Sequence, residues 1–161
     1  MLRNRFVRVV LSGLAAIAPG SKAYAGSDTA QLGVSVVVVS SCSINNGSLD
    51  FGQYASGQLD PLEAVGTISF TNCSGNLIIE LDGGTSGNVG ARQMRSGSHS
   101  VQYQIYRNPT RSMVWGMGAE AREITLLTPQ SGAIALYGRI PAGQAVPDGS
   151  YHDVINVTMT F

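Results

Sequence analysis

The chain has 161 residues, and its ten basic and ten acidic side chains give a formal net charge of zero. Four of the basic residues fall within the first 25 positions, namely Arg3, Arg5, Arg8 and Lys22. Residues 26–161 therefore carry six arginines against ten acidic side chains, a formal charge of −4. A nucleic-acid-binding protein needs a basic surface to neutralise phosphates. We expect no nucleic-acid partner.

The first 25 residues are predicted to be a cleaved export signal. A basic start is followed by a short apolar run over residues 9–17, far below the roughly 20 residues that a membrane span needs. Ala23-Tyr24-Ala25 has the Ala-x-Ala pattern of a cleavage site. The predicted cut lies between Ala25 and Gly26, and the residues that follow are enough for one domain.

Cys42 and Cys73 are the only cysteines. In an exported protein an even number of cysteines predicts a disulfide, and closing this interval contributes about 3–4 kcal/mol in the chain-entropy account. The alternative is a metal site, which would need closely spaced cysteines or clustered histidines. The sequence has neither pattern, so we expect no metal site.

Residues 30–39 are predicted to form an apolar strand. Every second side chain is a branched aliphatic one, namely Leu32, Val34, Val36 and Val38. This spacing is typical of a strand with one buried face. The stretch contains no proline and no charge, so an unpaired strand here would seek a partner through both its edge and its apolar face.

The rest of the chain alternates strand patterns with turn signals. Residues 43–51 predict a short strand interrupted by Asn45-Asn46-Gly47, and residues 83–100 predict a long exposed loop rich in glycine and serine. Residues 142–149 are predicted to form a turn-rich connection between strands. Further strands are predicted over residues 64–73, 76–82, 101–106, 113–115, 123–127, 133–140 and 151–161. No segment has a helical period, so the fold class is predicted to be an all-β sandwich.

The two ends of this predicted sandwich are unusual. The last strand places four apolar side chains on one face, namely Ile155, Val157, Met159 and Phe161. The sequence ends on that strand, and the apolar strand of residues 30–39 precedes the first cysteine. Both features are odd for a self-sufficient sandwich.

The residues resemble the spore coat U domain family, which pilin subunits of archaic (Csu-type) chaperone–usher pili use. The resemblance runs from Cys42 to Phe161. It rests on the order of Cys42-x-Ile44, Leu49-x-Phe51-Gly52-x-Tyr54, Leu81-Asp82-x-Gly84, Arg92-x-Met94, Tyr103-x-Ile105-Tyr106, Trp115-Gly116-x-Gly118, Tyr137-Gly138-Arg139-Ile140, Gly149-x-Tyr151-x-Asp153 and Val157-Thr158-x-x-Phe161.

This resemblance implies an incomplete immunoglobulin-like β-sandwich that lacks its last strand and is completed by donor-strand complementation. Residues 26–41 would be the N-terminal donor-strand extension, and residues 42–161 the pilin domain. The implied donor side chains are Leu32, Val34, Val36 and Val38. The implied acceptor groove is formed by Ile155, Val157, Met159 and Phe161, with Leu49 and Phe51 as candidates for the opposite wall.

The implied partners are a periplasmic chaperone, an outer-membrane usher and neighbouring pilin subunits. The subunit would be exported through the periplasm and polymerise head to tail by donor-strand exchange. The resulting cell-surface pilus would support adhesion and biofilm formation.

Other classes of function fit the sequence less well. His99 and His152 are expected on the surface, without a nucleophile elbow or a placed acid. Glu120 and Glu123 are expected on a polar face rather than as a catalytic carboxylate pair. We therefore expect no enzymatic activity and no cofactor.

Two non-catalytic alternatives remain open. One is a secreted coat protein, which the family's name suggests. The other is a carbohydrate- or surface-binding module built on the aromatic side chains Tyr103, Tyr106, Trp115 and Tyr137. Aromatic side chains in strands usually belong to the core, so the pilin interpretation is preferred.

Overall fold

The computed structural model of the protein describes residues 27–38 and 41–161. The chain divides after Val37 into two units. Residues 27–38 form neither helix nor strand, so this part of the predicted strand at residues 30–39 has no strand structure here. The predicted export signal and its cleavage site at Ala25 and Gly26 lie outside the described residues.

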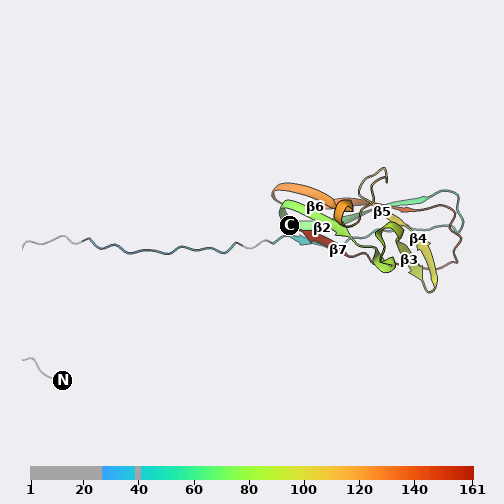
Figure 1. The fold of residues 1–161 in the computed structure, drawn as a ribbon, viewed down its shortest axis with the longest axis horizontal. Coiled ribbons are helices and arrows are strands. Elements are labelled where there is room, and N and C mark those ends of the chain that lie inside the picture. Colours follow the sequence, from blue (N-terminus) through green and yellow to red (C-terminus); the bar gives the residue numbers. More distant parts are fainter. Residues whose placement is uncertain (1–26, 39–40) are drawn as a thin grey trace, which may run out of the picture. The chain divides into compact units, whose positions relative to one another are not determined.

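Residues 41–161 form an all-β fold, as predicted (Figure 1). The short elements η1 (Gly84–Ser86), η2 (Val89–Ala91) and η3 (Gly118–Glu120) are single 3-10 turns. In the part of the chain that the structure describes, no helix is long and apolar enough to cross a membrane. The strands are β1 (Ser43–Ile44), β2 (Leu62–Leu81), β3 (Gln93–Ser96), β4 (His99–Gln102), β5 (Gln104–Tyr106), β6 (Arg122–Ile140) and β7 (Val157–Thr160).

Two long antiparallel strands, β2 and β6, form the frame of the fold. The first arm of β2 pairs with the end of β6, from Leu62 opposite Ile140 to Phe70 opposite Gly132. Its second arm pairs with the start of β6, as far as Ile79 opposite Arg122. The register shifts between Phe70 and Gly75, and Asn72 and Gly75 adopt positive φ angles there. Each long strand was predicted as two strands with a break, so these breaks prove to be bulges inside continuous strands.

The remaining strands complete two layers around this frame. β1 pairs with β2 near Phe70, and β5 pairs with the end of β6. β7 pairs with the second arm of β2, from Leu81 opposite Val157 to Ile78 opposite Thr160. The structure therefore has one layer of β1, β2, β6 and β5, and a second layer of β6, β2 and β7.

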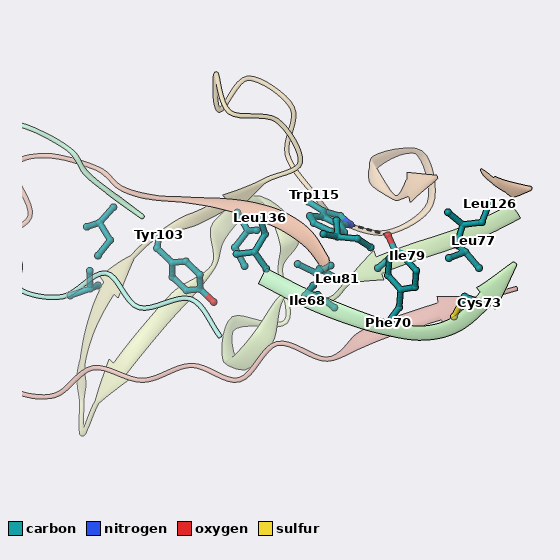
Figure 2. Packing of buried hydrophobic residues seen from close by; sticks show 14 residues of the cluster. Ile68, Phe70, Cys73, Leu77, Ile79, Leu81, Tyr103, Trp115, Leu126 and Leu136 are labelled. Atoms are coloured by element: carbon teal, nitrogen blue, oxygen red, sulfur yellow. Dashed lines mark hydrogen bonds between the residues drawn. The ribbon is translucent and has the colours of Figure 1, made fainter. Parts of the chain in front are cut away.

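The hydrophobic core lies between the arms of β2 and β6 (Figure 2). Alternate side chains of both arms of β2 are buried, including Ile68, Phe70, Leu77 and Ile79. Trp115 is fully buried in the same cluster, and its indole Nε1 donates a hydrogen bond to the carbonyl oxygen of Ile79 at 2.9 Å. The period of two in the sequence therefore identifies the inward side of each strand.

The predicted loop at residues 83–100 is partly wrong. It contains η1 and η2, and then β3, which pairs with β4 as a hairpin from Gln93 opposite Gln102 to Ser96 opposite His99. Gly97 has a φ of 56° at the first position of the two-residue turn, where a tight hairpin requires a residue that tolerates positive φ. The predicted strand at residues 101–106 is also divided, into β4 and β5.

A buried arginine joins separate parts of the core. The Arg92 side chain is fully buried. Its guanidinium donates hydrogen bonds to the carbonyl oxygens of Asp82 at 2.7 Å and Trp115 at 2.9 Å, and to the amide oxygen of Gln104 at 2.6 Å. Burial lowers the pKa of Arg92 from its usual value, but these acceptors satisfy the charged group inside the protein. Sequence analysis did not identify this role.

Two carboxylates anchor the segment that leads into β7. The carboxylate of Asp82 accepts hydrogen bonds from the backbone and the side chain of Asn156 at 3.0 and 2.6 Å. The carboxylate of Asp153 accepts them from the hydroxyls of Thr85 and Tyr103, both at 2.6 Å. Burial acts to raise the pKa of each carboxyl, but these hydrogen bonds outweigh it and lower the pKa of both. Burial also raises the pKa of Tyr103, so its hydroxyl keeps the donated proton.

The disulfide joins the start of the domain to the bulge of β2. Cys42 and Cys73 are bonded across a sequence separation of 31 residues. Replacing both by alanine should lower the free energy of unfolding by about 3–4 kcal/mol, because the unfolded chain loses its cross-link. Urea unfolding of the variant and of the oxidised protein measures the difference. Unfolding midpoints that coincide would show that the bridge contributes no stability.

Asp153→Asn should lower the free energy of unfolding at pH 7 by about 1–2 kcal/mol, because hydrogen bonds to a charged acceptor become neutral ones. The pKa of Asp153 is lowered in the folded state, so its contribution is complete above the unfolded pKa of about 4 and is lost as the pH falls below it. The difference in free energy of unfolding between the wild type and Asp153→Asn, measured by urea unfolding, should therefore become smaller between pH 5 and pH 2. Asp148→Asn, at an exposed position, is the control, and a gap that widens towards acid pH would contradict the assignment.

Candidate functional site

The predicted acceptor residues on the last strand form one half-buried face. Burial alternates along residues 151–160, and Ile155, Val157 and Met159 lie on the partly buried side and pack against the core. Phe161 lies beyond β7 and is 56% exposed. Apolar side chains that contact a core and still reach solvent are suited to cover by another apolar segment.

The backbone of β7 offers the second element of the site. One edge of β7 pairs with β2, and its other edge has no strand partner among residues 41–161. An unpaired edge presents backbone N–H and C=O groups that can hydrogen-bond to an added strand. The described part of the domain therefore combines an open strand edge with an apolar face on the same element.

The other two predicted acceptor residues precede β2. Leu49 and Phe51 are half-buried and pack against the same core cluster as β7. Both lie over Gly138 of β6, where an added Cβ would be 2.6 Å from the Phe51 ring and 2.8 Å from Leu49 Cδ2. The Phe51 ring also meets Tyr103 edge to face, with ring centroids 6.0 Å apart. Gly138 thus makes room for these two side chains on the first layer.

The predicted donor side chains lie in the described segment of residues 27–38. Leu32 and Val34 are each 88% exposed, Val36 is 84% exposed and Val38 is 87% exposed. Val37, on the opposite parity, is 87% exposed. The segment thus exposes its aliphatic side chains.

The anchors of β7 are the residues that sequence analysis missed. Asp82 and Asp153 belong to the family motifs Leu81-Asp82-x-Gly84 and Gly149-x-Tyr151-x-Asp153. No sequence pattern predicts that Asp82 bonds to Asn156 or that Asp153 bonds to Thr85. A further anchor is the backbone pairing of Arg95 with His152, with hydrogen bonds of 2.8 and 3.0 Å. These contacts determine where the chain enters β7.

The residues considered for catalysis do not converge. His99 and His152 are exposed, and so are Glu120 and Glu123. Among residues 27–38 and 41–161, no group of three or more histidine, cysteine, aspartate or glutamate side chains could hold a metal ion. The apolar face and open edge of β7 are the better candidate site.

The chain is similar to a protein family and to a bacterial protein of comparable length. The Spore Coat Protein U domain family matches residues 28–158. Protein U of Myxococcus xanthus is 29% identical over 178 residues, which cover 94% of each chain.

Three solved structures share the fold, each with a TM-score of 0.51. One is the chaperone–tip adhesion subunit pre-assembly complex of the archaic chaperone–usher Csu pili of Acinetobacter baumannii, at 23% identity; the match covers 74% of this chain and 39% of that one. Another is a chaperone–usher pilus, at 17% identity with coverage of 88% and 99%. The third is the P pilus rod subunit PapA, at 20% identity with coverage of 74% and 97%.

The match over residues 28–158 includes almost all of the domain described above. The protein therefore belongs to the Spore Coat Protein U domain family.

Proposed function

We propose that this protein is a structural pilus subunit that polymerises head to tail by donor-strand exchange. On this proposal a chaperone receives it in the periplasm, an outer-membrane usher assembles it, and the pilus at the cell surface supports adhesion and biofilm formation. The observation that carries the proposal is the half-exposed apolar face of β7 next to its open edge. The fold shared with chaperone–usher pilus subunits supports it.

The proposed acceptor groove lies between β7 and the segment that contains Leu49 and Phe51. A strand added to the free edge of β7 would gain a ladder of backbone hydrogen bonds. Its inward side chains would cover the exposed parts of Ile155, Val157 and Met159. Both gains come from the same insertion, which makes the contact specific for an extended apolar segment.

The proposed donor is residues 30–39 of a second copy of the chain. Leu32, Val34, Val36 and Val38 recur at the strand period and would all point into the groove. Burying one such side chain contributes roughly 1.5–3 kcal/mol before the cost of ordering the segment is deducted. A donor at one end and an acceptor at the other make an open, heterologous contact, which generates a fibre rather than a closed ring.

The earlier alternative of an aromatic sugar-binding surface is less well supported. Trp115 is fully buried and Tyr103 is 6% exposed, so both belong to the core. Tyr106 and Tyr137 are half-buried in β5 and β6. The aromatic side chains therefore support a packing role, and we propose a structural function without catalysis.

Val36→Asp should abolish fibre formation while the subunit still folds and still binds its chaperone, because a charge would enter the apolar groove of the neighbouring copy. Fibres are counted by electron microscopy after co-production with the cognate chaperone and usher. Ser35→Asp is the matched control, because it adds the same charge on the opposite face of the donor strand and should leave fibres intact. Wild-type fibre lengths from Val36→Asp would refute the donor assignment.

Met159→Asp should weaken binding of a synthetic peptide of residues 27–41 to the chaperone-released subunit by at least about tenfold, because the half-buried acceptor face would gain an unpaired charge. Thr158→Asp, on the exposed side of β7, should leave binding within about twofold. Titration monitored by the emission of the only tryptophan, Trp115, gives the affinities. Equal losses in the two variants would place the acceptor elsewhere.

A further inference from the structure

One end of the domain carries no charged side chain. It is formed where residues 41–49, 70–79 and 124–138 meet, through the pairing of β1 with β2 and of β2 with β6. None of these residues is aspartate, glutamate, lysine or arginine, although most of residues 70–76 and 125–133 are exposed. This charge-free end can therefore meet another surface without burying an unpaired charge.

A bulge of β6, formed by Leu127, Thr128 and Pro129, lies at the charge-free end. Between two successive pairs of the β2–β6 ladder, β6 has these three residues where β2 has only Ser74. Leu127 is 94% exposed, more than any other large hydrophobic side chain of residues 41–161. A single exposed leucine is ordinary on a protein surface, but this one lies next to the point where the donor segment leaves the domain.

The donor segment is apolar on both faces only at the end nearest the domain. The four side chains proposed to enter the groove occupy the even positions from 32 to 38. At the odd positions, Gly33 and Ser35 come first, whereas Val37 and Val39 follow. Because side chains alternate along a strand, these two valines would face away from the groove in an inserted donor. The acceptor groove therefore does not explain why they are apolar.

The direction of an inserted donor follows from where chains leave the domain. The donor leaves its own domain at the charge-free end, because Cys42 is bonded to Cys73 there. β7 of the acceptor finishes at the corresponding end of its own domain, since it pairs with the part of β2 next to the register shift. A donor parallel to β7 would bring two charge-free ends together, where the acceptor's own donor segment also leaves. The antiparallel direction avoids this crowding and would put Val38 near Ile155.

Val154 of the acceptor then lies beside the joint between the two subunits. Its side chain is 74% exposed, and the alternation of burial along residues 151–160 places it on the outer face of the acceptor. An antiparallel donor would put Val37 and Val39 on that same outer face. The four steps from Val38 to Cys42 span at most about 14 Å, which would keep the charge-free end of the donor subunit close to these valines.

We infer that each joint of the fibre has a second apolar contact on its outer face, between the charge-free end of one copy and the next copy of the chain. In this contact Leu127 of the donor subunit packs on Val37 and Val39 of its own donor segment and on Val154 of the acceptor subunit. The inference rests on the proposed function, because the three valines come together only when a donor is inserted. Removing this apolar surface from water stabilises the joint against bending and against escape of the donor.

Cross-linking of assembled fibres locates the contact. Fibres of Leu127→Cys combined with Val154→Cys, treated with a short bis-maleimide and boiled in detergent, should give a ladder of covalent oligomers. Leu127→Cys combined with Phe161→Cys, the pair that a parallel donor would bring together, should give monomers, and so should each single variant. Fibres of the first pair without a ladder, or a ladder from the second pair, would overturn the inference and leave the proposed function standing. If the wild type forms no fibres, both fail.

Charge substitutions measure what the contact contributes. Leu127→Asp should still form fibres and bind the synthetic peptide of residues 27–41 as the wild type does, because Leu127 lies outside the groove. Its fibres, and those of Val37→Asp, should dissociate in guanidinium chloride at least about fivefold faster than wild-type fibres. Leu59→Asp, at a position that is 91% exposed, and Ser35→Asp, on the same face of the donor as Val37, are the matched controls and should dissociate at the wild-type rate. Equal rates in variants and controls would overturn the inference.

Discussion

The structure depends on the pairing of β2 with β6 through a bulge. Both strands contribute to both layers, because the register shift between Phe70 and Gly75 lets each strand continue from one layer into the other. Every other strand of this sheet is added to that frame, with β1 and β7 on β2 and β5 on β6. The buried indole of Trp115 then hydrogen-bonds to the backbone of the second arm of β2. β2 lies between β6 and β7 in this arm, so β7 stands at the border of the sheet, and its outer edge has no strand partner among residues 41–161.

The sequence predicted which side chains face inward, but not how the strands connect. Alternation identifies Ile68, Phe70, Leu77 and Ile79 as one buried set, because a strand repeats every two residues whatever its partners. The same pattern cannot tell a turn from a bulge, since both are marked by residues such as Asn72 and Gly75 that tolerate positive φ. Hairpin β3–β4 was missed because its glycine- and serine-rich surroundings resemble a loop.

The candidate site was predictable to a similar extent. Ile155, Val157 and Met159 are apolar at every second position, and this spacing predicts the half-buried face on which they lie. Contacts between distant residues, such as those of Asp82 with Asn156 or Asp153 with Tyr103, have no local signature. The same holds for Arg92, whose acceptors come from three separate parts of the chain. Side-chain networks of this kind follow from the tertiary fold, so they become visible only in the structure.

The position of the disulfide has a mechanical consequence. If a fibre is pulled, the tension in each donor segment enters its own subunit through residue 41 and reaches Cys42 first. The bond to Cys73 transfers that load covalently to the bulge of β2, beyond the two residues of β1. β2 is the strand that pairs with β7, on which the next donor would be held. Force would thus pass from one joint to the next along a single continuous strand, and the short, weakly paired β1 would carry little of it.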